Sequence, residues 1–409
     1  MATQRAAGSL ESVARGSIEK TQSQGPPTGS PSIHLDALRG FAAFSVLLNH
    51  WRDAFFVDYR ALPHHSFILT MAYLLAGLGR QWVIVFFVMS GYLVGGSVIK
   101  AVHSERWTWP GYLLSRLTRL YIVLLPALLL GGAMDWIGMH LPGTAVIYSG
   151  HSGMHALTAN VHSTLTLPVL LGNAFFLQTT AFLAKVGHAA PPFGSNGSLW
   201  SLSNEFWYYM AFPPLVFLLA RGRSWRMRMI YAFCLLAWGW FVGRDIVLLG
   251  IPWLTGVLIP FLPPIPSRRR WVRISAIALA LAFLGGGLVL DKLLNSFSGD
   301  LVLGCTVALL IWVTMHCAIS PVPPAYARIA QRAARSSYTL YLVHLPLLIL
   351  LKASLHLPRA VPGWHNCLLC MGLLVVILLY AQLVYQIFEK HTDQVRGWLK
   401  PYVLARKKA

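Results

Sequence analysis

Acidic residues are scarce in this sequence of 409 residues, which holds 13 Asp and Glu against 33 Lys and Arg. Charged residues make up 11% of the chain and apolar residues 56%. Soluble domains carry about 25% charged residues. A chain with so few charged residues could not cover the surface of a soluble fold with polar groups, so an ordinary water-soluble protein is excluded. Five cysteines are too sparse for a disulfide-stabilised secreted scaffold. The composition therefore predicts an integral membrane protein.

Several familiar chemical signatures are also lacking. The sequence has no Walker loop, no dinucleotide fingerprint and no HExxH zinc motif. His151, His155 and His162 could suggest a metal site, but they lie in a loop without a nearby carboxylate, so we expect no metal. The net charge of +20 would suggest nucleic acid in a soluble protein. Here the basic residues cluster between apolar runs, which is typical of membrane topology and not of a nucleic-acid partner.

Ten apolar segments are long enough to cross a bilayer as helices of roughly 20 residues. The predicted spans cover residues 37–57, 81–99, 111–139, 198–220, 228–243, 245–263, 272–290, 301–319, 336–355 and 364–388. Two further apolar segments, 66–79 and 164–183, are shorter or interrupted, and we interpret them as re-entrant or interfacial. The expected fold is an all-α integral membrane protein with about ten transmembrane helices plus one or two re-entrant or interfacial helices.

The basic residues predict how these spans are oriented. With both termini cytosolic, the inner tails and loops hold about three times as many Lys and Arg as the outer segments, as the positive-inside rule expects. The predicted organisation is a disordered cytosolic tail over residues 1–33, a membrane domain over 34–390 and a basic cytosolic tail over 391–409. Residues 1–33 contain no apolar run of the kind that forms the core of a signal peptide.

Ionisable residues inside the predicted spans are functional candidates, because a charge at mid-bilayer costs at least about 2.5–3.5 kcal/mol. Glu205 is the one acidic residue placed well within a span, and His344 lies at mid-depth in the ninth span. Arg39 and His50 in the first span face the same side of a helix, about 16 Å apart. A snorkelling arginine and a hydrogen-bonded core histidine would explain that pair equally well. Together, two histidines and one glutamate indicate a polar chamber.

Two further pairs of residues stand at informative positions. Arg116 and Arg119, spaced i, i+3 at the start of the third span, share a helix face that could hold phosphates. Their spacing alone fits simple cytosolic anchors better. Ser90 and Gly91 lie near the middle of the second span, where Gly91 permits a close helix approach and Ser90 could contact a ligand. Structural packing is the alternative interpretation of this second pair.

Five stretches of the sequence together resemble the acyltransferase type 3 family, integral-membrane O-acyltransferases that modify sugars and other extracytoplasmic acceptors. They are LDALRGFAAFSVLLNH, FFVMSGYLV, RLTRLYIVLLP, LWSLSNEFWYYMAFP and SYTLYLVHLPLL, in the family's order. The resemblance extends from about His34 to Glu389. Asn204 departs from the family pattern by replacing a usually aliphatic residue, and Phe206 and Trp207 replace commonly polar ones. These departures bear on the acceptor side.

The resemblance implies a ten-helix membrane domain that moves an acyl group, usually acetyl, from cytosolic acyl-coenzyme A (acyl-CoA) to a hydroxyl of an extracytoplasmic or lipid-linked glycan. It also implies a multi-pass protein of the inner (cytoplasmic) membrane, surrounded by lipid and without a metal. His50 corresponds to the residue that the family uses in catalysis. We expect Glu205 and His344 to assist it. We expect the acyl-CoA donor to be bound by Arg39, Arg116, Arg119 and Ser90.

The residue types suit this chemistry. A sugar hydroxyl is a poor nucleophile near pH 7 and needs a base that titrates near neutrality, which histidine supplies. Two other functions stay open: a polytopic transporter or permease with the same polar chamber, and a non-catalytic assembly factor for envelope polysaccharide. The sequence also leaves open the identity of the acceptor, the length of the acyl chain, and the choice between direct transfer and a covalent acyl-enzyme.

Overall fold

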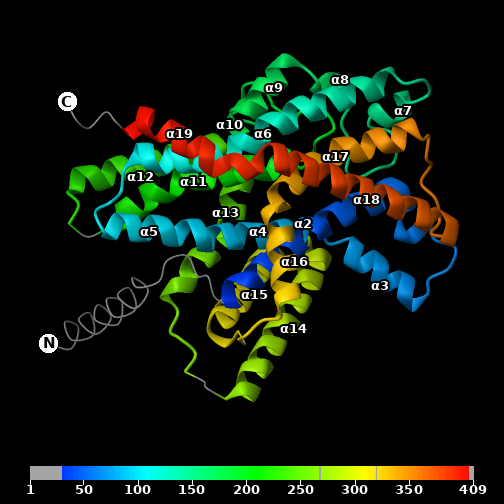
Figure 1. Cartoon of the computed structure of the whole chain (residues 1–409). Coiled ribbons are helices and arrows are strands. Elements are labelled where there is room, and N and C mark those ends of the chain that lie inside the picture. Colours follow the sequence, from blue (N-terminus) through cyan, green and yellow to red (C-terminus); the bar gives the residue numbers. More distant parts are fainter. Residues whose placement is uncertain (1–29, 221, 267–268, 319, 405–409) are drawn as a thin grey trace.

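The computed structural model describes residues 30–220, 222–266, 269–318 and 320–404 (Figure 1). Within these ranges the chain is helical, without a strand, and contains one isolated bridge between Phe56 and Ala360. The predicted all-α class is confirmed. Almost all of the predicted N-terminal tail lies outside the described residues.

Every one of the ten predicted spans coincides with a helix. These are α2 (Ser30–Phe55), α4 (Gly79–Ser90) with α5 (Gly96–His103), α6 (Trp109–His140), α11 (Leu199–Leu219), α12 (Trp225–Val242), α13 (Arg244–Leu258), α14 (Arg270–Leu294), α15 (Phe297–Cys317), α17 (Ser337–Ser354) and α18 (Trp364–Ile387). In the described chain, 7 helices are long and apolar enough to cross a membrane by length and composition. Helices α2, α11 and α12 are not among them, so the count of ten and the side of the termini stay predictions.

Shorter helices lie at the ends of the long ones. Helix α3 (Phe67–Ala76) falls in the first segment predicted as re-entrant or interfacial, and α9 (Leu167–Ala174) and α10 (Ala181–Lys185) fall in the second. The loop before α9 holds two single turns, α7 (Ala145–Tyr148) and α8 (Val161–Thr164). Two helices were not predicted: α16 (Pro324–Arg335) and α19 (Thr392–Leu404). Helix α19 packs along α6, so part of the stretch predicted as a basic tail is a helix (Figure 1).

Helix α17 forms the centre of the bundle. It packs against α2, α6 and α18. Of the residues in its apolar 18-residue stretch, 72% are buried, whereas the corresponding value for α14 is 28%. Helices α14 and α15 form a hairpin on one side of the molecule, and the short helices α7 to α9 lie on the opposite side (Figure 1). Because α2 and α6 both pack against α17, polar residues on their inner faces are brought together inside the bundle.

Helix α4 passes into α5 through a π-helical turn, Gly91–Gly95, directly after Ser90. The carbonyl of Trp253 on α13 lies where a Cβ of Gly91 would be, and Gly256 on α13 approaches the α4 backbone just as closely. The prediction that Gly91 permits a close helix approach is therefore confirmed. Such π-bulges are frequent at functional sites, and this one turns Ser90 toward α13.

Candidate active site

The two predicted intramembrane histidines contact each other. The Nδ1 atom of His50 on α2 lies 2.7 Å from the Nε2 atom of His344 on α17. Their rings are nearly parallel, at 11°, with centroids 5.1 Å apart. His344 is fully buried, whereas His50 keeps part of its surface accessible. The histidine of the first span therefore faces the interior of the bundle.

The hydrogen bonds of this pair define its tautomers. The Nδ1 atom of His344 lies 2.9 Å from the carbonyl oxygen of Leu340, one turn earlier on α17. A carbonyl can only accept, so Nδ1 of His344 carries the proton, and the Nε2 atom of a neutral His344 is an acceptor. It then accepts from the Nδ1–H of His50. This assignment leaves the Nε2 atom of His50 unprotonated, with a lone pair that can take a proton from a substrate.

A second cluster surrounds Glu205 on α11. The hydroxyl of Ser90 donates to Oε1 of Glu205 at 2.9 Å, and the hydroxyl of Tyr209 donates to the same oxygen. The indole Nε1–H of Trp253 lies 3.3 Å from the Ser90 oxygen and donates to it. The hydrogen of Ser90 is thus committed to Glu205. The carbonyl of Leu340, and not Glu205, orients the His344 ring.

Tyr341 connects the two clusters. It lies on α17, three residues before His344, and the two rings are 6.3 Å apart between centroids. Its hydroxyl lies 2.6 Å from the hydroxyl of Ser201, which is one helical turn from Glu205 on α11. Residues one turn apart on a helix are neighbours, with Cβ atoms about 5–6 Å apart. The histidine pair and the Glu205 cluster therefore belong to one polar region.

The two predicted donor-side arginines lie near the start of α6 but have different partners. The guanidinium of Arg116 lies over the rings of Tyr112 and Tyr209, at 5.7 and 5.8 Å from their centroids. Its Nε atom is buried without a hydrogen-bond partner. In the described ranges no carboxylate forms an ion pair with Arg116. Its charge and its N–H groups are therefore available to an anion.

Arg119 is paired with a carboxylate that was not predicted as part of the site. Its guanidinium lies 3.5 Å from Oε1 of Glu389, which follows α18. The other oxygen, Oε2, accepts from the backbone N–H of Thr339 at 3.1 Å and from its hydroxyl at 2.6 Å. Arg119 also lies over the ring of Tyr338, yet 44% of its side chain remains exposed. Glu389 thus anchors Arg119 to the start of α17 beside a water-accessible space.

Arg39 lies beside this group. Its guanidinium donates to the carbonyl of Ala334 at 3.0 Å and lies 3.7 Å from Asp36. Arg119 and Glu389 are close enough to interact with it electrostatically. Its Nε atom is buried and has no hydrogen-bond partner. Arg39 on α2, Arg119 on α6 and the start of α17 therefore lie in one region with an excess of positive charge.

The opposite ends of α2 and α17 carry a separate ionic group. Arg359 donates to Asp58 at 2.7 Å and lies 3.7 Å from Asp53, while Arg52 lies within 4.0 Å of both carboxylates. The hydrogen bond from Arg359 is the main reason that the pKa of Asp58 lies below its ordinary value. Asp58 is also 3.3 Å from Nε2 of His155. The view that these loop histidines lack a nearby carboxylate was wrong, because Asp58 is distant in sequence.

These carboxylates and His155 could together hold a cation by geometry. Two guanidinium groups already lie against them, however, so a bound cation would have to displace or tolerate two positive charges. We therefore interpret the group as an ionic link between the ends of α2 and α17 and not as a metal site.

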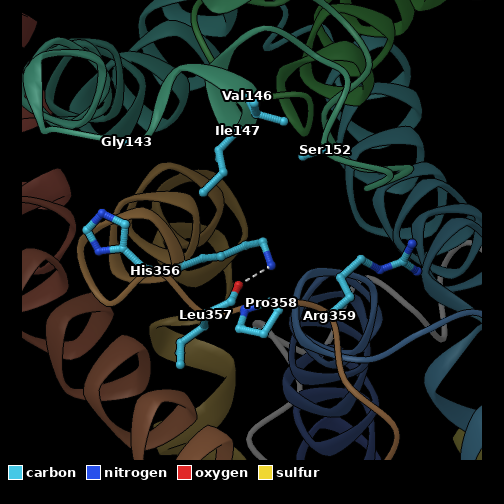
Figure 2. Close-up of a pocket in the computed structure, with 9 residues that line it drawn as sticks. Gly143, Val146, Ile147, Ser152, His356, Leu357, Pro358 and Arg359 are labelled. Atoms are coloured by element: carbon cyan, nitrogen blue, oxygen red, sulfur yellow. Dashed lines mark hydrogen bonds between the residues drawn. The ribbon is translucent and has the colours of Figure 1, made fainter.

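A pocket of about 320 Å³ lies beside this ionic group (Figure 2). Its lining comes from the loop after α6 and from the end of α17 with the following loop. The lining residues are Gly143, Val146, Ile147, Ser152, Lys352, His356, Leu357, Pro358 and Arg359. This pocket was not predicted, because neither loop contains a recognisable motif.

Two of the three residues that depart from the family pattern, Phe206 and Trp207, pack against Phe176. Phe206 stacks on Phe176 with centroids 4.3 Å apart, and the indole of Trp207 donates to the carbonyl of Phe176 at 2.9 Å. Phe176 lies between α9 and α10. These two aromatic residues therefore attach α11 to the segment predicted as interfacial.

The family model of the type 3 acyltransferase domain matches residues 33–385, which is most of the chain. The chain belongs to this family. No curated protein and no solved structure matches it. Family membership together with the apolar helices identifies a membrane acyltransferase and favours acyl transfer over transport.

Some residues of the type 3 acyltransferase site could have been found from the sequence and others could not. Tyr209 stands four residues after Glu205, so a helix places both on one face. Tyr341 stands within the same motif as His344. Glu389 follows the last predicted span, at the end of the predicted membrane domain, and was not singled out as a site residue. Its contact with Arg119 joins residues 270 positions apart, which no local pattern reveals.

Proposed function

We propose that this protein is an O-acyltransferase that moves an acetyl group from cytosolic acyl-CoA to a hydroxyl of an extracytoplasmic or lipid-linked glycan in the cytoplasmic membrane. The observation that carries the proposal is the pair formed by His50 and His344. Their hydrogen bonds leave the Nε2 atom of His50 as a free base inside a membrane bundle. A base is what transfer to an unactivated hydroxyl requires.

Acyl-CoA binds, in this proposal, at the starts of α2 and α6. Coenzyme A carries a pyrophosphate and a 3′-phosphate, and charge-assisted hydrogen bonds from arginine are well suited to phosphate. Arg116 offers a guanidinium without a carboxylate partner, Arg119 is held in place by Glu389, and Arg39 adds a third positive charge. The thioester then extends from this region toward the histidine pair.

The chemical step follows from the tautomers. Nε2 of His50 takes the proton of the acceptor hydroxyl while the hydroxyl oxygen attacks the thioester carbonyl. The new C–O bond forms a tetrahedral intermediate, which collapses as the C–S bond breaks. The thiolate of coenzyme A leaves and receives the proton from Nε2 of His50, so the enzyme returns to its starting state. During the step the Nδ1–H of the charged His50 ring remains bonded to His344, which stabilises the imidazolium.

Glu205 acts beside this step in the proposal. Its carboxylate accepts hydrogen bonds from Ser90 and Tyr209, and it lies one turn from Ser201, whose hydroxyl bonds to Tyr341. A carboxylate that accepts from several hydroxyls can accept from substrate hydroxyls as well. We assign to Glu205 the orientation of the substrate near the thioester, and to Ser90 the fixing of Glu205.

The test is a transfer assay with the purified full chain in phospholipid nanodiscs. Acetyl-CoA labelled in its acetyl group is supplied together with glycan fractions of the cells that produce the protein. We expect label in the glycan and release of one free thiol for each acetyl group transferred. A protein that consumes no acetyl-CoA with any fraction would contradict the proposal, and uptake of solute by proteoliposomes without acetylation would indicate a permease.

A further inference from the structure

We propose that the pocket between the loop after α6 and the end of α17 is the binding site for a sugar residue of the acceptor. This inference rests on the proposed function, since it names where that function takes up its second substrate. It concerns the side of the molecule opposite to Arg116 and Arg119, which the family motifs do not describe.

The position of the pocket is the first argument. Arg119 lies near the start of α6, and the pocket begins directly after the end of this helix, at Gly143. The 21 residues from Arg119 to His140 correspond to about 32 Å of helix. The hydrocarbon core of a bilayer is about 30 Å thick. The arginines on α6 and the pocket beyond its end are therefore separated by about the thickness of a bilayer core.

The second argument is that α17 ends at the pocket and that a lining residue of α17 is hydrogen-bonded to the end of α2. The ammonium group of Lys352, which lines it, donates to the carbonyl of Ala54 on α2 at 2.8 Å. Ala54 is one turn beyond His50, so the two lie about 6 Å apart along the helix axis. Lys352 itself is eight residues beyond His344 on α17, or about 12 Å. Lys352 thus places the pocket within about two to three helical turns of both histidines.

The third argument is the chemistry of the lining. Lys352 is buried, and its ammonium also donates to the carbonyl of Leu357 at 2.8 Å, the bond drawn in Figure 2. Two of its three N–H groups are therefore used, and the third can donate to a ligand oxygen. Ile147 points from the opposite loop toward the end of α17 (Figure 2). With Leu357 and Pro358 it gives the pocket an apolar wall.

This combination fits a sugar residue. A sugar ring presents hydroxyl oxygens at its edge and C–H groups on its faces, so it can accept from Lys352 while a face lies on the apolar wall. Small-molecule sites have volumes of about 300–1,000 Å³, and the pocket, at about 320 Å³, lies at the lower end of that range. Arg359 is occupied by Asp58 and by the carbonyls of Phe56 and Gly153, so it shapes the pocket and does not supply free charge.

The first experiment measures binding without a donor. The full chain in nanodiscs is titrated with fluorescently labelled oligosaccharides from the polysaccharide of the producing cells, and separately with their extracted lipid-linked glycans. Ile147→Trp fills the pocket, and we expect it to weaken binding by at least about tenfold, equivalent to about 1.4 kcal/mol. Val146→Trp serves as a second filling variant, because its side chain is exposed and a larger one is tolerated. Leu75→Trp, exposed on α3, is the matched control and should bind as the wild type does.

Equal affinity of the wild type and both filling variants for these glycans would overturn the proposal. A wild type that binds neither the free oligosaccharides nor the lipid-linked glycans would also overturn it. Which of the two probes binds identifies the acceptor as a free or a lipid-linked glycan. The second experiment adds acetyl-CoA to the same samples. We expect Ile147→Trp to raise the KM for the acceptor without changing the KM for acetyl-CoA, which also shows that the variant is folded.

The two proposals fail in different ways. If Ile147→Trp abolishes binding but the wild type transfers no acetyl group, the proposed function is wrong and the sugar pocket remains. If the wild type transfers acetyl groups and both filling variants do so with an unchanged KM for the acceptor, the pocket is wrong and the function remains.

Discussion

Replacing His344 by leucine removes the acceptor for the Nδ1–H of His50, together with the hydrogen bond from His344 to the carbonyl of Leu340. His344 is fully buried, and leucine fills the site with an apolar side chain. The Nδ1–H of His50 then has no partner, and the proton can move to Nε2, the atom that must be a base. His344→Gln is the matched control, because its amide oxygen can still accept from His50.

The size of the effect follows from the 2.7 Å hydrogen bond between the two rings. In the transition state His50 is an imidazolium, so this bond is charge-assisted. Hydrogen bonds to charged groups contribute about 1.5–3 kcal/mol. Since about 1.36 kcal/mol corresponds to a tenfold change in rate, we expect His344→Leu to lower kcat by about 10-fold to 160-fold. His344→Gln should keep most of the activity.

The assay is steady-state acetyl transfer in nanodiscs, with kcat and the KM for acetyl-CoA measured separately. The KM should change little, because the hydrogen-bond partners of His344 are His50 and Leu340 and not the arginines proposed to bind the donor. Thermal unfolding of each variant, compared with the wild type, controls for stability. A leucine variant with the kcat of the wild type would refute the tautomer argument, and so would equal losses in the leucine and glutamine variants.

Three further predictions concern the proposed donor site, the close approach of α4 to α13, and the ionic group at the ends of α2 and α17. Arg116→Gln should raise the KM for acyl-CoA by about tenfold or more with a smaller effect on kcat, because it removes a charged phosphate donor; an unchanged KM would exclude this role. Gly91→Ala should lower stability in thermal melts by about 1–3 kcal/mol through its clash with α13, whereas Gly96→Ala, whose Cβ meets no neighbour, should not. The hydrogen bond from Arg359 keeps the pKa of Asp58 below its ordinary value of about 3.9, so its contribution to stability should be present above about pH 4 and be lost as the pH falls further. Melts of Asp58→Asn between about pH 7 and pH 3 should lack this acid-dependent loss, and a profile like that of the wild type would contradict the assignment.

Much of the helical architecture was predictable because apolar runs of about 20 residues have few alternatives to forming helices. All ten predicted ranges are helices, including the polar first span, which begins at Ser30 in the structure. The π-helical turn after Ser90 was not predicted, because nothing in the order of the residues distinguishes it from an α-helix. Helix α16 was missed because its arginines were interpreted as a loop.

The candidate site was only partly predictable, for a different reason. Motifs and the cost of polar groups in lipid pointed to His50, His344 and Glu205, but their pairing depends on how distant helices pack. The two histidines are 294 positions apart, and their contact was not foreseen. Nor was the preference of Glu205 for Ser90 and Tyr209 over an imidazole. Sequence periodicity describes one helix at a time, whereas these contacts arise between helices.

The most direct measurement of the central claim is the mass of the envelope glycans from cells that carry the wild-type gene, His50→Ala, or no gene. We expect glycans heavier by the mass of the acyl group in cells with the wild-type gene only. His50→Ala should be inserted at wild-type levels and still bind acetyl-CoA. Acylated glycan at wild-type abundance in cells with His50→Ala would contradict the assignment of the base to this residue.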